Sequence, residues 1–273
     1  MKVIEQFVEG KDPDPAPCED LILVTGDFAV VVDGATDKAG VDFDGRSGGI
    51  VAAEAVRDAF LELDREAELA DLVGEASAVL AERVAGAGAG IDPLIDDGPS
   101  ASFVAFSDCR REVWRVGDCS WMTESETVPG GKAIDGTCAN ARAALLRALL
   151  ERGVGEDELL KDDPGRAMIM PLLRNQHLFR NLEEPASGYT FGAIDGREVP
   201  RRFQEVWSVS QAGEIVFASD GYPVLEPTLE QTEAELVKEL ALDPLRIGRH
   251  PATKGLAPGL KSFDDRSYLR IGI

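Results

Sequence analysis

The sequence predicts an α+β fold in which antiparallel β-sheets and helices form separate runs. Predicted strands come in adjacent pairs along the chain, and predicted helices also follow one another. A doubly wound parallel sheet would instead require strict alternation of strand and helix. The 273 residues contain no internal repeat and no low-complexity linker long enough to divide them. We therefore expect a single domain over residues 1–273.

The first predicted elements are a β-hairpin and two helices. Two apolar runs, 21–24 and 28–32, flank a turn at Thr25-Gly26-Asp27 and predict paired strands. Residues 48–63 carry their apolar side chains on one broad stripe, which is typical of an amphipathic helix. A second helix is expected over 66–84, before a glycine-rich stretch.

The remaining elements continue the pattern of paired strands and separate helices. Thr228 is the expected N-cap of the last helix, with Gln231 three residues later. The stretch 153–185 is polar in parts, and we expect it to be irregular, with His177 in a surface loop. Strands are expected at 101–106, 112–116, 189–194, 205–210, 214–218 and 267–273, and helices at 139–152 and 228–240.

The composition limits the class of partner. A formal net charge of -22 repels the phosphate backbone, so nucleic acid is not an expected partner. Many carboxylates and only two histidines favour hard cations such as Mg²⁺ or Mn²⁺ over zinc. No apolar run approaches the length of a bilayer span, and the N-terminal residues lack a signal-peptide pattern. We therefore expect a cytoplasmic protein without a membrane partner.

Several predicted strands lead directly into an aspartate. Carboxylates at strand ends are held rigidly, as a metal site requires. Glycine follows Asp33 and Asp220 directly, which lets backbone or a bound water approach closely. One Asp-Gly pair is ordinary turn chemistry, but the repeated junction predicts a cation site. The aspartates at these junctions are Asp33, Asp118, Asp220 and the pair Asp264-Asp265, with Asp20 before the first strand of the hairpin.

These junctions belong to an ordered set of short motifs that covers nearly the whole chain. The motifs are Cys18-Glu19-Asp20, Val31-Val32-Asp33-Gly34, Pro99-Ser100-Ala101-Ser102, Arg115-Val116-Gly117-Asp118-Cys119-Ser120, Ala218-Ser219-Asp220-Gly221 and Asp264-Asp265-Arg266-Ser267. In order and spacing the set resembles the protein phosphatase 2C family, the metal-dependent (PPM) serine/threonine phosphatases, as a divergent bacterial-type member. The resemblance implies a four-layer αββα sandwich, in which two antiparallel β-sheets are flanked by helices.

The resemblance also implies roles for the aspartates. Asp33 would bridge two Mn²⁺ or Mg²⁺ ions, and Asp220 and Asp264 would complete the shell of the first. Asp118, together with Asp220, would hold a third and weaker ion. Asp20 and Asp265 would lie just outside the ligands, although the choice between Asp264 and Asp265 as the ligand stays open. The implied metal ligands are Asp33, Gly34, Asp118, Asp220 and Asp264, and the implied catalytic residues are Asp33, Asp220 and Asp264.

The chain departs from the family where the substrate phosphate is bound. Members of the family carry an arginine shortly before the Glu-Asp motif, whereas residues 12–17 contain none. Lys38 and Arg46, which follow Asp33 closely, are the predicted phosphate ligands, with Lys254 as the next candidate.

The function predicted from these residues is the hydrolysis of phosphomonoesters by a water that two metal ions activate. The resemblance implies phosphoserine or phosphothreonine in a phosphoprotein as the substrate. The missing arginine leaves a small phosphorylated molecule as an alternative substrate. A catalytically weak regulatory domain is a further alternative, although such a domain has no need of so many aspartates.

Overall fold

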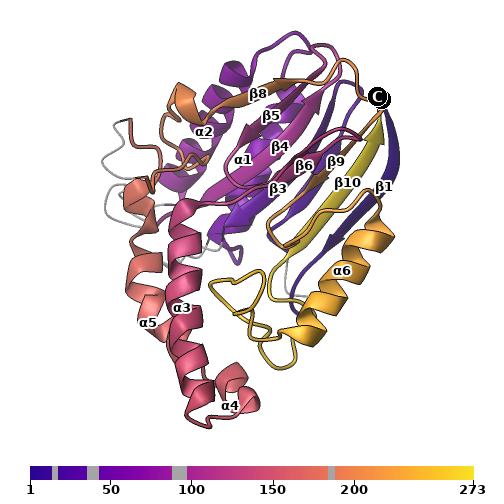
Figure 1. The fold of residues 1–273 in the computed structure, drawn as a ribbon. Helices are drawn as coiled ribbons and strands as arrows, with labels where there is room; N and C mark the ends of the chain where they lie inside the picture. Colours follow the sequence, from indigo (N-terminus) through magenta and orange to yellow (C-terminus); the bar gives the residue numbers. More distant parts are fainter. Residues whose placement is uncertain (14–17, 36–42, 88–96, 184–187) are drawn as a thin grey trace.

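The computed structural model describes residues 1–13, 18–35, 43–87, 97–183 and 188–273. These residues form two five-stranded antiparallel sheets that lie face to face (Figure 1). The first sheet contains, in spatial order, β1 (Lys2–Glu9), β10 (Arg266–Gly272), β9 (Glu214–Ala218), β6 (Ser120–Met122) and β7 (Thr127–Val128). The second contains β2 (Leu21–Val24), β3 (Phe28–Ala35), β4 (Ser100–Ser107), β5 (Glu112–Val116) and β8 (Glu205–Ser208).

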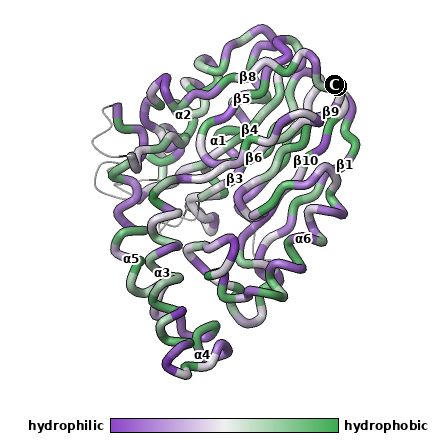
Figure 2. The backbone as a smooth tube through the Cα atoms, viewed as in Figure 1, coloured by the Kyte–Doolittle hydropathy of each residue, from purple (hydrophilic) through white to green (hydrophobic). Residues whose placement is uncertain are grey.

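Alternation along the strands divides the core into layers. Val31 of β3 packs between the sheets with Phe217 of β9 and Leu269 of β10. Its neighbours Val30 and Val32 point to the opposite face of the same sheet and join a different core cluster. Because both faces of β3 are buried, its sequence is a continuous apolar run. Figure 2 shows the same distribution, with the most hydrophobic stretches in the central strands.

Helices cover the outer face of each sheet. The pair α1 (Gly48–Glu62) and α2 (Leu69–Gly86) packs on the sheet that contains β3. On the other sheet, α6 (Leu229–Leu242) packs through Leu236 and Leu240. Thr228 caps α6 by accepting a hydrogen bond from the backbone N–H of Gln231 at 3.3 Å, as expected. The predicted αββα arrangement is therefore confirmed.

A group of three helices lies at one end of the sandwich (Figure 1). They are α3 (Ala133–Glu151), α4 (Glu156–Lys161) and α5 (Pro164–Arg174), followed by the short 3-10 helices η1 (Gln176–Phe179) and η2 (Arg201–Phe203). The expectation that 153–185 is irregular was wrong. Asp163 caps α5 by accepting from the N–H of Arg166 at 2.8 Å, and Pro164 occupies the first turn, where its missing N–H costs nothing.

Other boundaries also differ from the predictions. The strand expected at 189–194 was wrong, because this stretch makes only isolated bridges, Ala101↔Ile194 and Arg180↔Phe191. The strands β1, β6 and β7 were missed, and α3 begins at Ala133 rather than Ala139. In the described part of the chain, no helix has the length and apolar character needed to cross a membrane.

Candidate active site

A cavity of about 830 Å³ opens where the two sheets meet the α3–α5 group and the segment between α6 and β10. All of the aspartates singled out in the sequence line this cavity, although they are widely separated along the chain. They are Asp20, Asp33, Asp118, Asp220, Asp264 and Asp265. The fold thus gathers the predicted carboxylates into one place.

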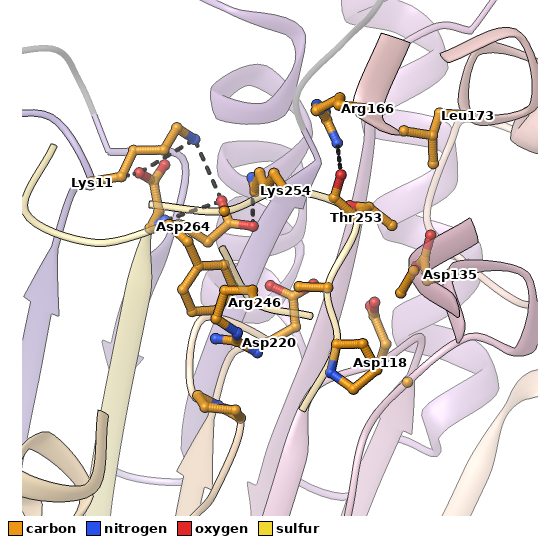
Figure 3. Close-up of a pocket in the computed structure, with 18 of the residues that line it drawn as sticks. Lys11, Asp118, Asp135, Arg166, Leu173, Asp220, Arg246, Thr253, Lys254 and Asp264 are labelled. Carbon is orange, nitrogen blue, oxygen red and sulfur yellow. Dashed lines mark hydrogen bonds and ion pairs between the residues drawn. The ribbon is translucent and has the colours of Figure 1, made fainter. Parts of the chain in front are cut away.

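The strand order explains why these side chains meet. Asp33 lies near the end of β3, paired in register with Ser102 of β4. Asp220 lies two residues after β9, and Asp264 lies two residues before β10, which pairs with β9. Each sheet therefore presents carboxylates at the same edge of the sandwich, and Figure 3 shows Asp118, Asp220 and Asp264 around this cavity.

Gly34 allows the chain to pack tightly beside Asp33. A Cβ atom at position 34 would overlap the carbonyl oxygen of Gly49 and lie 2.7 Å from that of Glu19. The N–H of Gly34 donates to the same Glu19 carbonyl at 3.2 Å. Glycine at this position thus holds the Glu19-Asp20 segment and the start of α1 against the strand that carries Asp33.

Asp20, Asp33 and Asp220 carry negative charge that the protein itself compensates poorly. Burial, followed by repulsion from neighbouring carboxylates, raises the pKa of Asp33 and of Asp220 well above the ordinary value. Neither side chain has a hydrogen bond or an ion pair with another described residue. Burial raises the pKa of Asp20 to about 7, even though Asp20 accepts a hydrogen bond from Ser267 Oγ at 2.9 Å.

Asp118, in contrast, is fully engaged by the protein. Its side chain is 2% exposed, and Oδ1 accepts a hydrogen bond from Ser102 Oγ at 2.6 Å. Oδ2 lies 2.7 Å from Nζ of Lys132, the residue that precedes α3. Burial disfavours the charged carboxylate, but Lys132 and Ser102 outweigh it, so the pKa of Asp118 is lowered.

Asp264 also has lysine partners. Nζ of Lys254 lies 2.6 Å from Oδ2, and Nζ of Lys11 lies 3.5 Å from Oδ1 (Figure 3). The adjacent Asp265 lies as near to Lys11, with 3.5 Å between Oδ1 and Nζ, but it also accepts backbone N–H groups, from Lys11 at 2.9 Å and from Glu19 at 3.0 Å. Both oxygens of Asp265 are thus engaged by the backbone of the N-terminal segment, whereas Asp264 meets the ammonium groups of Lys254 and Lys11. This geometry favours Asp264 over Asp265 as the ligand.

Of the two phosphate ligands expected from the sequence, only Arg46 belongs to the described residues. Lys38 lies outside the described residues. Arg46 is absent from the described residues that line the cavity, and its Nη1 pairs with Glu54 at 2.6 Å. Lys254, the next candidate, does line the cavity.

Sequence reasoning missed most of the cations in the cavity and misplaced one histidine. Lys11, Lys132 and Arg166 line the cavity, but each is an ordinary charged residue in the sequence, and only the fold brings them to the aspartates. His177, expected in a surface loop, is 4% exposed, and its Nδ1 lies 2.9 Å from the carbonyl oxygen of Arg174. It packs within η1 and does not line the cavity.

The donors in the cavity suit a hard divalent cation. Carboxylate oxygens are the preferred ligands of Mg²⁺ and Mn²⁺. Among the described residues, no three His, Cys, Asp or Glu side chains are grouped as ligands of one ion. Asp33 and Asp220 nevertheless have no ion pair among the described residues, and the charge of Lys132 only partly offsets the repulsion from the neighbouring carboxylates. A divalent ion is the kind of partner that these two side chains lack, so the residues fit such a group.

Comparison with known proteins agrees with this architecture. No protein-family model matches the chain, and no curated protein matches it in sequence. The structure is similar to the serine/threonine phosphatase Stp1 from Staphylococcus aureus, with a TM-score of 0.52 and 14% identity over 100% of this chain and 96% of that one. It is also similar to a bacterial serine phosphatase, with a TM-score of 0.50 and 14% identity over 98% and 96%.

At this level of identity the comparisons establish the fold. The order of the strands, the helices on both outer faces and the near-complete coverage of both chains agree with the resemblance seen in the sequence motifs. The chain therefore has the protein phosphatase 2C-like fold of the bacterial serine/threonine phosphatases.

Proposed function

We propose that this protein is a metal-dependent phosphatase that hydrolyses phosphomonoesters, with phosphoserine and phosphothreonine in proteins as its substrates. One observation carries the proposal. Asp33 and Asp220, which come from different sheets, face one cavity as mutually repelling carboxylates without a protein partner among the described residues. In a phosphatase fold, a pair of this kind is suited to holding divalent ions.

The proposed ligands are Asp33, Asp220 and Asp264, with the carbonyl of Gly34 beside Asp33. Bound Mn²⁺ or Mg²⁺ would supply an activated water and neutralise charge on the phosphoryl oxygens. Asp20 and Asp265 hold the surrounding chain in place, the first through Ser267 and the second through backbone N–H groups. Water serves as the nucleophile, so no serine or cysteine nucleophile is required.

The cations of the cavity would assist with the substrate. A phosphomonoester is close to a dianion, and a molecule of net charge -22 repels it at long range. Lys132, Lys254 and Arg166 all line the cavity and provide positive charge close to the carboxylates. This local charge would draw the phosphoryl group to the site against the field of the whole molecule.

The test is hydrolysis of p-nitrophenyl phosphate by the full chain with Mn²⁺, with Mg²⁺ and with excess chelator. We expect activity with either ion and none with chelator, because carboxylates alone do not lower the pKa of water enough. Undiminished hydrolysis in chelator would refute the proposal.

The same preparation separates the alternative functions. Phosphoserine and phosphothreonine peptides should be turned over with a higher kcat/KM than small aliphatic phosphate esters. The reverse preference would point to a small-molecule phosphatase on this fold. Binding of ions and of a phosphopeptide without turnover would point to a regulatory domain.

A further inference from the structure

Lys254 is paired with one of the proposed metal ligands, Asp264, and lies closer to it than Lys11 does. Its ammonium lies 2.6 Å from Oδ2 of Asp264, inside the cavity and among the candidate ligands (Figure 3). Its side chain is 28% exposed, so the ammonium also has access to the space where a substrate would lie. Asp264 is therefore a carboxylate for which an internal cation and a divalent ion would compete.

The main chain around Lys254 is held in place by two arginines from the helical group. Arg166 of α5 donates from Nη1 to the carbonyl of Thr253 at 2.8 Å. Arg142 of α3 donates from Nη1 to the carbonyls of Ala252 at 3.1 Å and Leu245 at 2.8 Å. These bonds hold the main chain just before Lys254 in place. They connect helices α3 and α5 to the segment between α6 and β10.

The burial of Arg142 shows that this attachment is built into the core of the helical group. Its side chain is fully buried, and its Nε donates to Asp163 at 2.7 Å. A buried guanidinium is costly unless it is paired and hydrogen-bonded, as this one is. Gly255 allows the chain after Lys254 to pack closely against Arg142 and residue 244. A Cβ atom at this position would lie 2.9 Å from the carbonyl oxygen of Pro244 and 3.1 Å from Arg142 Nη2. Lys254 is thus presented to Asp264 by a packed structure.

Lys254 differs in this respect from Lys132. Lys132 forms an ion pair with the buried Asp118, and the Lys132 side chain is only 16% exposed. Asp118 also accepts a hydrogen bond from Ser102. A divalent ion on Asp264 would share that carboxylate and repel Lys254, because like charges a few ångströms apart repel strongly in a partly buried site. The displaced ammonium would stay near the site, held there by the fixed main chain.

We propose that Lys254 has two partners in turn. Without a divalent ion it neutralises Asp264, and once an ion has bound Asp264 its ammonium contacts the phosphoryl oxygens of the substrate. The second half of this inference rests on the proposed function. Lys254 would then provide the phosphate contact for which the sequence offers no arginine before Asp20.

The first measurement is Mn²⁺ binding to the full chain by isothermal titration calorimetry. Lys254→Met should bind Mn²⁺ roughly tenfold more tightly than the wild type, because the nearer of the two described lysines that compete for Asp264 is gone and Lys11 remains, at 3.5 Å. The matched control is Lys261→Met, which removes the same charge from the same segment. Lys261 pairs with Glu9 at 2.9 Å and does not line the cavity, so its loss should leave the affinity unchanged.

The second measurement is the binding of inorganic phosphate to the Mn²⁺-loaded proteins. Lys254→Met should bind phosphate roughly tenfold more weakly, whereas Lys254→Arg, which keeps the charge, should retain most of the affinity. Tighter ion binding together with weaker phosphate binding is a signature that a merely structural lysine would not produce. If Lys254→Met fails to fold, Lys254→Gln should give the same two shifts.

Unchanged or weaker Mn²⁺ binding in both neutral variants would overturn the inference, as would unchanged phosphate binding. Absence of Mn²⁺ binding in every protein would overturn it too. The Lys254 variants could bind Mn²⁺ more tightly and phosphate more weakly than the wild type while the wild type hydrolyses no phosphomonoester. The inference about Lys254 would then stand, and the proposed catalytic function would fail. The two claims are therefore tested separately.

Discussion

The carboxylates of the cavity are of two kinds when each residue is considered singly. Asp118 is held by Ser102 and Lys132 from both of its oxygens. Asp33 and Asp220 have no such partners among the described residues. Burial raises the pKa of both, helped by repulsion from Asp20 and Asp118 for Asp33 and from Asp33 and Asp264 for Asp220. The sequence motifs present all of these residues alike, as an aspartate at the end of a strand. Only the structure distinguishes them.

This difference predicts opposite effects on the stability of the metal-free protein. Asp33→Asn removes one of several repelling charges and should raise the melting temperature measured in chelator. Asp118→Asn leaves the largely buried ammonium of Lys132 with only Asp135 among the described carboxylates, at 3.9 Å, which should cost about 1–3 kcal/mol of unfolding free energy. Thermal unfolding of the two variants by circular dichroism checks both. Destabilisation by Asp33→Asn would mean that Asp33 is compensated within the protein.

The two variants should also differ in activity. Asp33→Asn should lower Mn²⁺-dependent kcat by roughly 100-fold or more, because it removes a proposed ligand of the activating ions. Folded Asp118→Asn protein should retain more activity than Asp33→Asn. Equal losses in the two folded variants would contradict the assignment of Asp33 as the central ligand.

At the scale of secondary structure, the sequence is most informative where local patterns and tertiary packing agree. The hairpin β2–β3 and the cap at Thr228 were predicted from local residues and are present. Helix α4 was missed because its 6 residues are too few to display a period. Helix α5 contains Pro171, and a proline inside a segment argues against a helix when only the sequence is read. The strand β1 was missed, although exposed and partly buried residues alternate along Lys2–Glu9. Its partner β10 lies at the far end of the chain, so no neighbouring strand in the sequence indicated the pairing.

The same limit applies to the site. The aspartates were found because each lies at the start or the end of an apolar strand, and two of them precede glycine. Lys132 was not found, and Lys254 was named only after Lys38 and Arg46, because nothing in their local sequence separates them from surface lysines. Their role depends on contacts with Asp118 and Asp264, which the fold alone creates.

The close approach of β3 to α1 and to the Glu19-Asp20 segment can be tested at Gly34. Gly34→Ala would drive a methyl group into the carbonyls of Gly49 and Glu19, which are backbone atoms and cannot rotate away. We expect a loss of about 1–3 kcal/mol in unfolding free energy, measured by urea denaturation. The matched control is Gly26→Ala in the β2–β3 turn, where a Cβ meets no atom within 4 Å. Equal stability of the two variants would show that the close approach at Gly34 is not required.

For the molecule as a whole, the metal-free state concentrates negative charge in one cavity of a protein whose net charge is already -22. Burial and mutual repulsion raise the pKa values of Asp20, Asp33 and Asp220 in the folded state. The folded protein therefore holds more protons on these groups than the unfolded chain does. The stability that these three groups contribute is therefore lost as the pH rises through this range, whereas Asp118 and Asp264, whose pKa values are lowered, contribute in the opposite direction only near the ordinary value for aspartate.

This sign predicts the pH dependence of stability without metal. In chelator, the unfolding free energy should decrease as the pH rises from about 4, near the ordinary value for aspartate, to about 7, the value for Asp20. Saturating Mn²⁺ should remove most of that decrease, because bound ions favour the charged carboxylates. Urea denaturation at several pH values measures both curves. A metal-free stability that rises over this interval would mean that the three carboxylates are compensated within the protein.

The central claim is that the carboxylate cavity holds divalent ions, and the most direct measurement locates them. We expect crystals grown with Mn²⁺ to show anomalous scattering peaks within ligand distance of Asp33 and Asp220, and crystals of Asp33→Asn to lose at least one of them. Activity assays report the consequence of binding, whereas the anomalous signal reports the position of each ion. Ordered Mn²⁺ elsewhere, or none beside Asp33 and Asp220 at saturating concentration, would contradict the account.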